Sequence, residues 1–444
     1  MLSRAQTNHG DFMMESIWQN TTLPQFPQLT ADLNTDVLVI GGGMAGLLCA
    51  YLLHQAGVRT VLVEENRICS GVTSRTTAKI TAQHGLIYHK LLQAEGLEKA
   101  RMYLNANIEA LSLYESLCKQ IPCDFETKSN YVYNLQDPRP VDLELEALHH
   151  LGFSADKVDE LPLPFSTVGA VKFRHQAQFQ PLQFASHIAR GLEIYENTFV
   201  QRLDGRNAIT QHGKIRFDHV IVATHFPFVN RHGSYFLKLY QQRSYVLALK
   251  NGPYLGGMYV CGEDGGFSLR NSGEFLLLGG NNHHTGKEST GWKPLEELAA
   301  KCYPEAIPTH RWATQDCMSL DSIPYIGRYS RHTPRYYVAT GFNKWGMTSS
   351  MVSAMVLRDL ILGRSNPYAP VFNPSRSIMK PQLACNTLKT TANLLRPTRP
   401  RCPHLGCALH WNPNERSWDC SCHGSRFDRK GNRLDNPAQK DLEL

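Results

Sequence analysis

The stretch that decides the fold is TDVLVIGGGMAGLLCAYLL, residues 35–53. Its first six residues are rich in β-branched and apolar types, as in a buried strand, and the residues after the glycines form an apolar run typical of a buried helix. The glycines at positions 41, 43 and 46 separate the two with the spacing G-x-G-x-x-G. A second apolar run, residues 59–63, ends on Glu64. The stretch therefore predicts a strand, a glycine turn, a helix and a second strand.

The same stretch predicts a nucleotide site, because an acidic residue about 20 positions after the glycines completes the dinucleotide fingerprint. The glycines let the backbone approach a pyrophosphate at the helix N-terminus, and the acid accepts a hydrogen bond from a ribose hydroxyl. An ordinary strand–turn–helix unit is the alternative, whereas a membrane span is excluded because the run is too short and too rich in glycine. The fingerprint does not separate FAD from NAD. The expected contacts are Gly41, Gly43, Met44, Ala45, Gly46 and Glu64.

Two further segments favour FAD. They are ICSGVTSRTTAK, residues 68–79, and YVATGFNKWGMT, residues 337–348, which precedes an expected helix at about 349–362. Both resemble the D-amino-acid-oxidase-type flavoenzyme superfamily, and the resemblance covers roughly residues 30–365. It implies that the first segment borders the flavin ring and that the helix N-terminus stabilises negative charge at its pyrimidine end. The resemblance adds these FAD contacts: Thr76, Thr77, Ala78, Gly341, Lys344, Trp345, Gly346, Met347 and Thr348.

The C-terminal end contains CPHLGC at residues 402–407 and CSCHGS at residues 420–425. Two Cys-plus-His pairs suit a cluster in which one iron takes two thiolates and the other takes two imidazoles. Zinc also binds Cys and His at short spacings and is the alternative. The full order of residues resembles Rieske 2Fe–2S proteins. The resemblance implies one iron on Cys402 and Cys420, the other on His404 and His423, and a disulfide between Cys407 and Cys422.

This C-terminal segment is short for a Rieske domain. Before it lie a proline- and arginine-rich stretch, residues 395–401, and a linker without strand alternation. A segment of this size cannot bury enough surface to fold alone, so either the cluster and disulfide hold it against the main domain or the site is a remnant. Ser425 remains as a hydrogen-bond donor to the cluster, but Phe427 stands where high-potential relatives have Tyr, which predicts a lower potential.

The predicted fold class is α/β: a Rossmann-like FAD domain, an interleaved mixed β-sheet substrate domain and a small C-terminal all-β Rieske segment. Residues 92–121 show the periodicity of one or two amphipathic helices, and residues 243–283 are rich in strand formers. The expected boundaries are an arm at 1–34, the FAD domain at about 35–90, 170–230 and 315–365, the substrate domain at about 91–169 and 231–314, a linker at 366–400 and the Rieske segment at 401–444.

Composition adds little to the functional prediction. The chain has 444 residues and a formal charge of +7. The excess Lys and Arg residues are expected to be scattered over the solvated surface, and a site for an acidic partner is the less favoured interpretation. No motif for nucleic-acid binding is present. The polar N-terminus lacks the pattern of a signal peptide, which predicts a cytoplasmic protein, and a disulfide would be unusual there.

The resemblance implies a dehydrogenase-like enzyme that oxidises a small amine or amino-acid-type substrate. Electrons would leave the flavin one at a time for the cluster and then an external protein or quinone. Candidate catalytic residues are Lys79 and His84, beside the expected flavin ring, and Arg270, which could clamp a carboxylate; each could instead be structural or, for Arg270, a surface residue. Two alternatives stay open: a flavin oxidase with a non-functional Rieske remnant, and a redox sensor without turnover.

Overall fold

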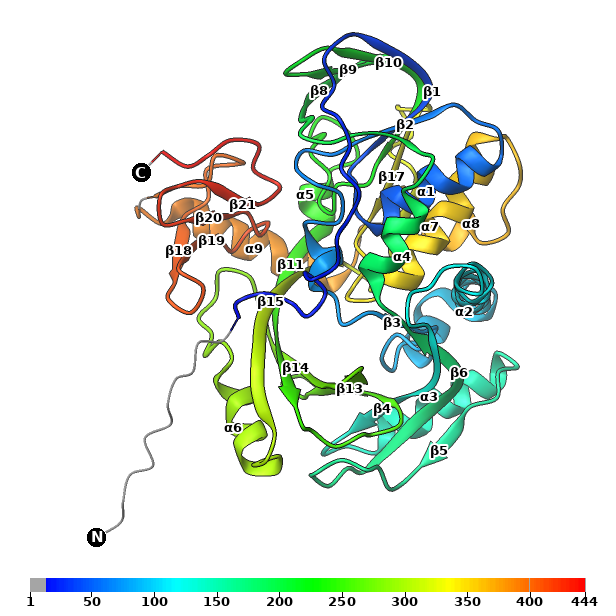
Figure 1. Ribbon diagram of the computed structural model, residues 1–444, viewed down its shortest axis with the longest axis vertical. Helices are drawn as coiled ribbons and strands as arrows, with labels where there is room; N and C mark the ends of the chain where they lie inside the picture. Colours follow the sequence, from blue (N-terminus) through cyan, green and yellow to red (C-terminus); the bar gives the residue numbers. More distant parts are fainter. Residues whose placement is uncertain (1–12, 399, 444) are drawn as a thin grey trace.

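A computed structural model describes residues 13–398 and 400–443. Within these residues the strands form three sheets (Figure 1). The predicted fold class is confirmed, because the described residues form a largely parallel sheet with helices, a mixed sheet interleaved with it along the chain, and a small antiparallel sheet near the C-terminus. Of the expected N-terminal arm, residues 1–12 lie outside the described residues.

The first sheet has the order β16-β17-β10-β1-β2-β7, and β9 joins β10 to β8. The neighbours of β1 run parallel to it on both sides, as expected for strands joined by crossover helices. Its strands are β1 (Leu33–Ile40), β2 (Thr60–Val63), β7 (Glu193–Tyr195), β8 (Val200–Asp204), β9 (Asn207–Thr210), β10 (Lys214–Val222), β16 (Tyr325–Arg328) and β17 (Tyr336–Thr340).

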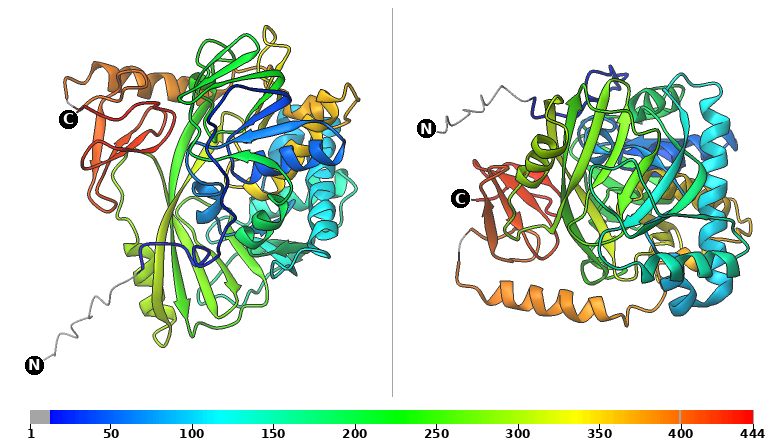
Figure 2. Two further views of the ribbon diagram at one scale, coloured as in Figure 1. Left: turned by 45° about the horizontal axis from the view of Figure 1, so that its top comes forward. Right: turned by 90° about the horizontal axis from the view of Figure 1, so that it is seen from below.

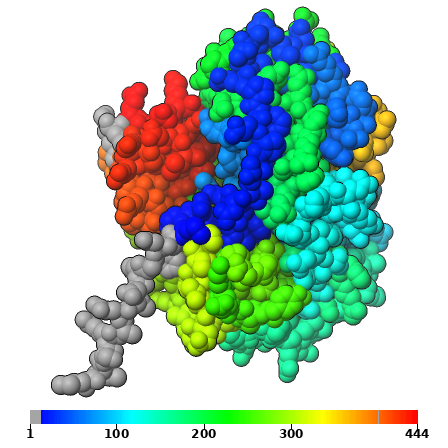
Figure 3. All heavy atoms as spheres, viewed as in Figure 1, coloured from blue at the N-terminus to red at the C-terminus, as the bar shows by residue number. Residues whose placement is uncertain are grey.

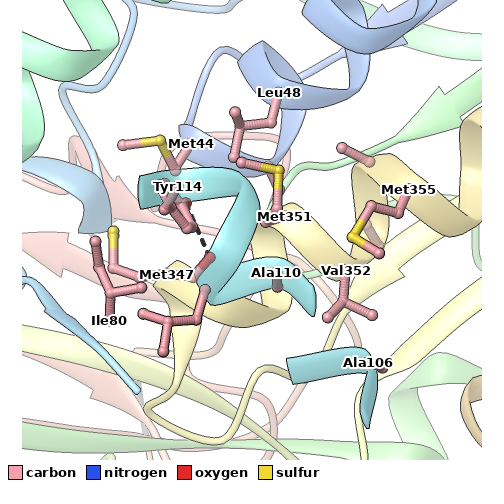
Figure 4. Packing of buried hydrophobic residues seen from close by; sticks show 14 of the residues in the cluster. Met44, Leu48, Ile80, Ala106, Ala110, Tyr114, Met347, Met351, Val352 and Met355 are labelled. Atoms are coloured by element: carbon pink, nitrogen blue, oxygen red, sulfur yellow. Dashed lines mark hydrogen bonds between the residues drawn. The ribbon is translucent and has the colours of Figure 1, made fainter. Parts of the chain in front are cut away.

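Buried helices cover this sheet. The helix α1 (Met44–Gln55) starts directly after the glycines, and α7 (Gly346–Ile361) packs against it. Figure 4 shows the methionine, leucine and alanine side chains that fill the space between α1, α7 and α2 (Tyr88–Cys118). The expected helix at 349–362 therefore begins three residues earlier than predicted, at the end of β17. The one or two amphipathic helices expected at 92–121 correspond to α2, which is interrupted at Gly96 by a left-handed φ of 82°.

The second sheet is mixed, with the order β15-β11-β14-β13-β12-β4-β6-β3 and with β5 paired to β6. Alternate side chains of its central strands are buried on opposite faces: Val246 and Leu277 join the core around α1, α2 and α7, whereas Leu247 and Leu278 join a second hydrophobic cluster. Its strands are β3 (Lys79–Ile80), β4 (Glu126–Asn134), β5 (Asp156–Val158), β6 (Gly169–Gln178), β11 (Leu239–Lys250), β12 (Met258–Cys261), β13 (Ser268–Ser272), β14 (Phe275–His284) and β15 (Ile307–Ser319). The shorter helices are η1 (Val72–Arg75), α3 (Arg139–His150), α4 (Pro181–Ile188), α5 (Tyr235–Lys238), α6 (Lys293–Cys302) and α8 (Ala369–Phe372).

The third sheet is a four-strand antiparallel meander near the C-terminus, among the residues described. The residues expected to form a linker contain the helix α9 (Pro381–Leu395), which lies along the outside of the molecule (Figure 2). The sequence analysis did not predict this helix. The strands of the meander are β18 (Leu409–Asn412), β19 (Ser417–Cys420), β20 (Arg426–Asp428) and β21 (Arg433–Asp435).

The C-terminal segment, residues 401–443, packs directly on the second sheet. A Cβ on Gly424 would lie 2.6 Å from the Gln241 side chain on β11, and one on Gly286 would lie 2.6 Å from the backbone nitrogen of Ser421. The segment and the second sheet are therefore in direct contact at both places. Packing against the main domain is one of the two alternatives that the sequence left open.

The N-terminal segment crosses one face of the molecule beside the C-terminal segment (Figure 3, dark blue and red). Trp18 is buried, and its indole nitrogen donates to the carbonyl of Thr76 at 2.8 Å. The backbone nitrogen of Met13 donates to Thr309 on β15 at 3.2 Å. The segment thus ties the second sheet to the loop before β3. In the described part of the chain, no helix is both long and apolar enough to cross a membrane.

Candidate active site and metal centre

A cavity of about 560 Å³ lies where the three sheets meet, and we call it the central cavity. Its walls come from the glycine turn, from the loop between β2 and β3, from the end of β17 and from β11, β14 and β15. Residues 432–441 of the C-terminal segment form a further wall. The cavity is therefore shared by all three structural units.

The glycine turn has the shape that a dinucleotide requires. A Cβ on Gly41, which has a φ of 108°, would lie 2.6 Å from the carbonyl oxygen of Ala223. A Cβ on Gly46 would lie 1.9 Å from the carbonyl oxygen of Gly41. Gly43 precedes α1 without a side-chain cap, and the N–H of Met44 donates to the hydroxyl of Thr73 at 3.1 Å, so a ligand at the helix N-terminus would be held by the following N–H groups of the first turn. This turn, whose close backbone contacts exclude a Cβ at Gly41 and Gly46, fits the pyrophosphate of FAD.

Glu64 stands at the end of β2 and lines the central cavity. Its carboxylate accepts hydrogen bonds from the backbone nitrogens of Gly42 at 2.7 Å and Asn66 at 2.9 Å. Burial raises the pKa of this carboxyl above its ordinary value, while the two backbone donors work in the opposite direction. The two bonds hold the acid at the position where the fingerprint places a ribose hydroxyl.

Most of the expected flavin contacts line the central cavity. A lysine, Lys344, is exposed to the cavity beside Trp345, and burial lowers its pKa although Asp316 opposes the shift. Three expected contacts lie behind the wall instead: Gly46, Ala78 and Thr348. Those that line the cavity are Gly41, Gly43, Met44, Ala45, Glu64, Thr76, Thr77, Gly341, Lys344, Trp345, Gly346 and Met347.

Lys79 lines the central cavity on β3, and its Nζ donates to the hydroxyl of Thr77 at 3.0 Å. Burial lowers the pKa of this lysine to about 7, and the positive charge of Arg270 contributes to the shift. A lysine with such a pKa exchanges its proton near neutral pH.

Arg270 lies just behind this wall on β13, with an exposed fraction of 1%. Its Nη1 donates to the carbonyl of Asn271 at 3.3 Å, while its Nε and Nη2 have no hydrogen-bond partner among the described residues. The guanidinium lies 5.6 Å from the ring centroid of Trp18. Burial lowers its pKa to about 9. Two cations thus meet beside the cavity, and Arg270 keeps unused donors.

His84 does not reach the cavity. Its ring stacks on Trp345 at 5.0 Å, its Nδ1 lies 2.6 Å from the hydroxyl of Tyr103, and its Nε2 lies 2.9 Å from the hydroxyl of Thr348. Burial lowers its pKa to about 3, so the ring is neutral. The geometry gives His84 the position of a support behind Trp345 and not of a group that touches a ligand.

The four expected cluster ligands converge at the edge of the third sheet. The rings of His404 and His423 lie 5.0 Å apart, and the thiols of Cys402 and Cys420 are hydrogen bonded to each other. The Nδ1 atoms of both histidines are buried without a hydrogen-bond partner in the described residues. Two unpaired imidazole nitrogens beside two buried thiols are the donor set of a Rieske cluster, and this site fits one.

The outer nitrogens of the same histidines face the main domain. His423 Nε2 lies 3.0 Å from the carbonyl oxygen of Phe236, and His404 Nε2 lies 3.5 Å from Oδ1 of Asn230. A carbonyl accepts only from a protonated nitrogen, so Nδ1 of His423 is the unprotonated ligand atom. His423 is buried, whereas His404 is half-buried.

The disulfide implied by the resemblance is not formed in the structure. Cys407 and Cys422 are free thiols, and their sulfur atoms lie within 4.8 Å of each other and of Cys420. A disulfide needs sulfur atoms about 2 Å apart. The pairing of these two cysteines stays a prediction.

One side chain connects the cluster site with the central cavity. Gln241 on β11 donates from Nε2 to the carbonyl of His423 at 2.7 Å, and its Oε1 lies 3.2 Å from Nε2 of His225. His225 lines the cavity. The ring of Phe226 lies 6.3 Å from that of His404 and 6.1 Å from that of His423. The cluster ligands and the cavity wall are therefore neighbours.

Buried charges hold the C-terminal segment in this place. Arg243 on β11 forms a bidentate pair with Glu415, and Arg426 donates to Glu415 at 2.9 Å and to Asp419 and Asp435 at 3.0 Å each. Burial alone would raise the pKa of Glu415, but the two arginines lower it to about 2. We call these five residues the docking ion cluster.

Sequence reasoning did not find Gln241, His225 or the wall formed by residues 432–441. No local signal marks them, because each contributes through a contact with a segment far away in the chain. Gln241 and His423, for example, are 182 positions apart.

Comparisons with known proteins agree with this geometry. The family model described as FAD dependent oxidoreductase matches residues 36–360, and the model described as Rieske [2Fe-2S] domain matches residues 386–444. The chain is 34% identical to the "Putative Rieske 2Fe-2S iron-sulfur protein YhfW" of Bacillus subtilis, over 97% of each chain.

Solved structures share the fold of the main part of the chain. Glycine oxidase from Geobacillus kaustophilus superimposes with a TM-score of 0.67 at 18% identity, over 78% of this chain and 100% of that one. L-proline dehydrogenase from P. horikoshii gives a TM-score of 0.65 at 16% identity, over 78% and 98% of the two chains.

Proposed function

Since the chain belongs to the FAD-dependent oxidoreductase family and carries a Rieske 2Fe–2S domain, we propose that it oxidises a small amine or amino-acid-type substrate and passes the electrons one at a time through the cluster to an external acceptor. FAD takes two electrons from a substrate, whereas a 2Fe–2S cluster carries one at a time. The observation that carries the proposal is the Gln241 bridge between His423 and the cavity wall.

The proposal gives each structural unit a separate task. The first sheet holds FAD through the glycine turn, Glu64 and the residues around Lys344, at the N-terminus of α7. The second sheet supplies the substrate side of the central cavity through β11, β14 and β15. The third sheet holds the cluster on Cys402, His404, Cys420 and His423. We base these cofactor-binding assignments on the residues that line the cavity and on the arrangement of the cysteines and histidines.

Lys79 and Arg270 support a substrate that has both a carboxylate and an amine. Lys79 lines the cavity, and the buried Arg270 lies behind this wall with two free donors; a positive charge here favours an anionic ligand over a neutral one. A lysine with a pKa of about 7 can also take a proton from a substrate ammonium group. The structural relatives include proteins titled glycine oxidase, L-proline dehydrogenase and L-amino acid deaminase, which supports an amino-acid-type substrate.

We assign the exit to the external acceptor to His404. Its ring is half-buried, and the neighbouring Leu405 is 42% exposed, whereas His423 is enclosed by the main domain. His404 therefore meets the main domain at Asn230 but keeps part of its ring accessible, whereas His423 does not. A protein or quinone acceptor could approach only His404.

Two competing functions are less well supported. The intact ligand set, with both Nδ1 atoms unpaired, argues against a flavin oxidase with a Rieske remnant. A redox sensor without turnover needs no room for a substrate. The central cavity, however, continues from the glycine turn to the second sheet, which favours turnover.

The test is an anaerobic single turnover of the holoprotein with a panel of amino acids. Flavin absorbance and the Rieske EPR signal are followed together, and iron and FAD are quantified first. We expect the cluster to become reduced after the flavin, with one spin per cluster. If a substrate bleaches the flavin while the cluster stays oxidised, and admitted oxygen yields one peroxide per substrate, the protein is a flavin oxidase and the proposal is wrong.

A further inference from the structure

The terminal loop, residues 432–441, lies on the central cavity although it belongs to the C-terminal segment. The residues that this loop contacts show which end of the cavity it covers. Arg433 forms an ion pair with Glu65, the residue next to Glu64, and its guanidinium lies 5.4 Å from the ring centroid of Phe199. Phe199, Glu64 and Glu65 all line the cavity. The terminal loop therefore covers the end where the fingerprint acid meets a ribose.

Arg433 is held firmly in this position. Its backbone nitrogen donates to the carboxylate of Asp441 at 2.9 Å, and its Nη1 donates to the carbonyl of Ala438 at 3.1 Å. Its side chain is 17% exposed. Because hydrogen bonds hold both its backbone and its guanidinium, and because it lies over an aromatic ring, Arg433 adds a rigid, positively charged side chain to the cavity wall.

The same loop is fastened to the main domain and to the cluster site. Asn436 donates from Nδ2 to the carbonyl of Thr224, another cavity residue, at 2.5 Å, and its own carbonyl accepts from Gln241 at 3.1 Å. The backbone nitrogen of Ala438 donates to the hydroxyl of Ser425 at 3.0 Å. Ser425 is also hydrogen bonded to the thiol of Cys402, an expected iron ligand. The nucleotide wall and the cluster loop are thus parts of one hydrogen-bonded unit.

We propose that the terminal loop of the Rieske segment completes the adenosine end of the FAD site, with Arg433 as the closing residue. The Rieske segment then has a second task besides carrying electrons, because bound FAD cannot leave until the loop moves. The coupling between FAD binding and docking of the segment is reciprocal, so bound FAD also stabilises the docked segment. This inference depends on FAD as the cofactor and not on the substrate or on the path of electrons.

The first test measures the release of FAD from the purified holoprotein. Arg433→Ala and the matched control Arg429→Ala are compared, since Arg429 is an exposed arginine in the same segment that does not line the cavity. After dilution, released FAD is followed by its fluorescence. We expect release about tenfold faster from Arg433→Ala than from wild type or the control, as for the loss of one charged contact. Iron content and the Rieske EPR signal should be unchanged.

Equal release rates for the two variants would overturn the proposal. A second measurement covers the case in which Arg433→Ala does not fold, because it uses the wild-type chain alone. Trypsin cleavage after Arg429 and Lys430, both exposed, is compared between the FAD-loaded and the FAD-free protein with iron retained. We expect cleavage to be slowed at least severalfold by FAD. Identical cleavage rates would show that the nucleotide and the terminal loop do not interact.

Discussion

Neutralising Glu415 should loosen the C-terminal segment from the main domain. The substitution Glu415→Gln keeps the shape of the side chain and removes its charge. Arg243 is 1% exposed and has Glu415 as its ion-pair partner, so the substitution leaves a buried guanidinium without its counter-charge. Arg426 keeps Asp419 and Asp435. The substitution therefore removes the ion pair between Arg243 on the second sheet and Glu415 in the C-terminal segment.

The magnitude can be worked out in two ways. The pKa of Glu415 is lowered from 4.5 to about 2, and a shift of this size corresponds to about 3 kcal/mol in favour of the ionised form. Breaking a buried ion pair by removing one partner costs roughly 3–5 kcal/mol. The pKa shift includes the effect of Arg426, which lies in the same segment, and only the pair with Arg243 crosses to the main domain, so the loss in docking is at most about 3 kcal/mol, a factor of roughly 100 in the docking equilibrium.

The sign of the pH dependence follows from the same shift. A carboxyl whose folded pKa is lowered stabilises the fold above its ordinary pKa, and this contribution is lost as the pH falls from about 4.5 to about 2. The glutamine variant imitates the protonated state at every pH. It should therefore lack the contribution at pH 7.

The assay is denaturant unfolding at pH 7, followed by cluster absorbance for the C-terminal segment and by flavin fluorescence for the main domain. We expect the two transitions to coincide in wild type and the cluster transition to move to lower denaturant in Glu415→Gln. The matched control is Glu443→Gln, an exposed carboxyl in the same segment. A cluster transition unchanged to within about 0.5 kcal/mol would refute the reasoning that buried charges dock the segment.

Three further predictions test other parts of the site. Substrate oxidation should rise with pH through about 7, because Lys79 accepts a proton only when neutral, and Lys79→Met should flatten this profile; an unchanged profile would exclude Lys79. Gly46→Ala should abolish FAD binding, because its Cβ would lie 1.9 Å from the carbonyl oxygen of Gly41; a variant with the FAD content of wild type would contradict this. Phe427→Tyr should raise the cluster potential by roughly 40 mV, the equivalent of a hydrogen bond of about 1 kcal/mol for one electron, and a redox titration that shows no rise would count against a missing donor.

Sequence reasoning succeeded where the chemistry is local. The glycine turn needs only three glycines between a strand and a helix, and the structure shows at Gly41 and Gly46 why a Cβ is not tolerated. The cluster ligands could likewise be read from two short motifs. Each of these features is marked by residue types within a few positions of one another, so the sequence reveals it, although the contact that excludes a Cβ at Gly41 comes from the distant Ala223.

Reasoning from the sequence failed for features that depend on contacts between distant residues, and for the distribution of charge along the chain. The sequence left open whether the C-terminal segment is held against the main domain, because its partners Gln241 and Arg243 lie far away in the chain. The basic excess was expected to be scattered, and this is wrong. Residues 360–414 contain seven Lys and Arg residues and no Asp or Glu. This one stretch therefore has a formal charge of +7, which equals that of the whole chain.

The small size of the C-terminal segment explains why docking and function cannot be separated. Its core contains few apolar side chains, and four of these are the cysteines of the cluster site. Such a core supplies too little burial to fold alone, so the segment borrows stability from its neighbours. The docking ion cluster and the Gln241 bridge provide that stability, and they also place His423 beside the cavity wall. A variant that undocks the segment should therefore lose iron as well as electron transfer, because the contacts that position the cluster are the contacts that keep it folded.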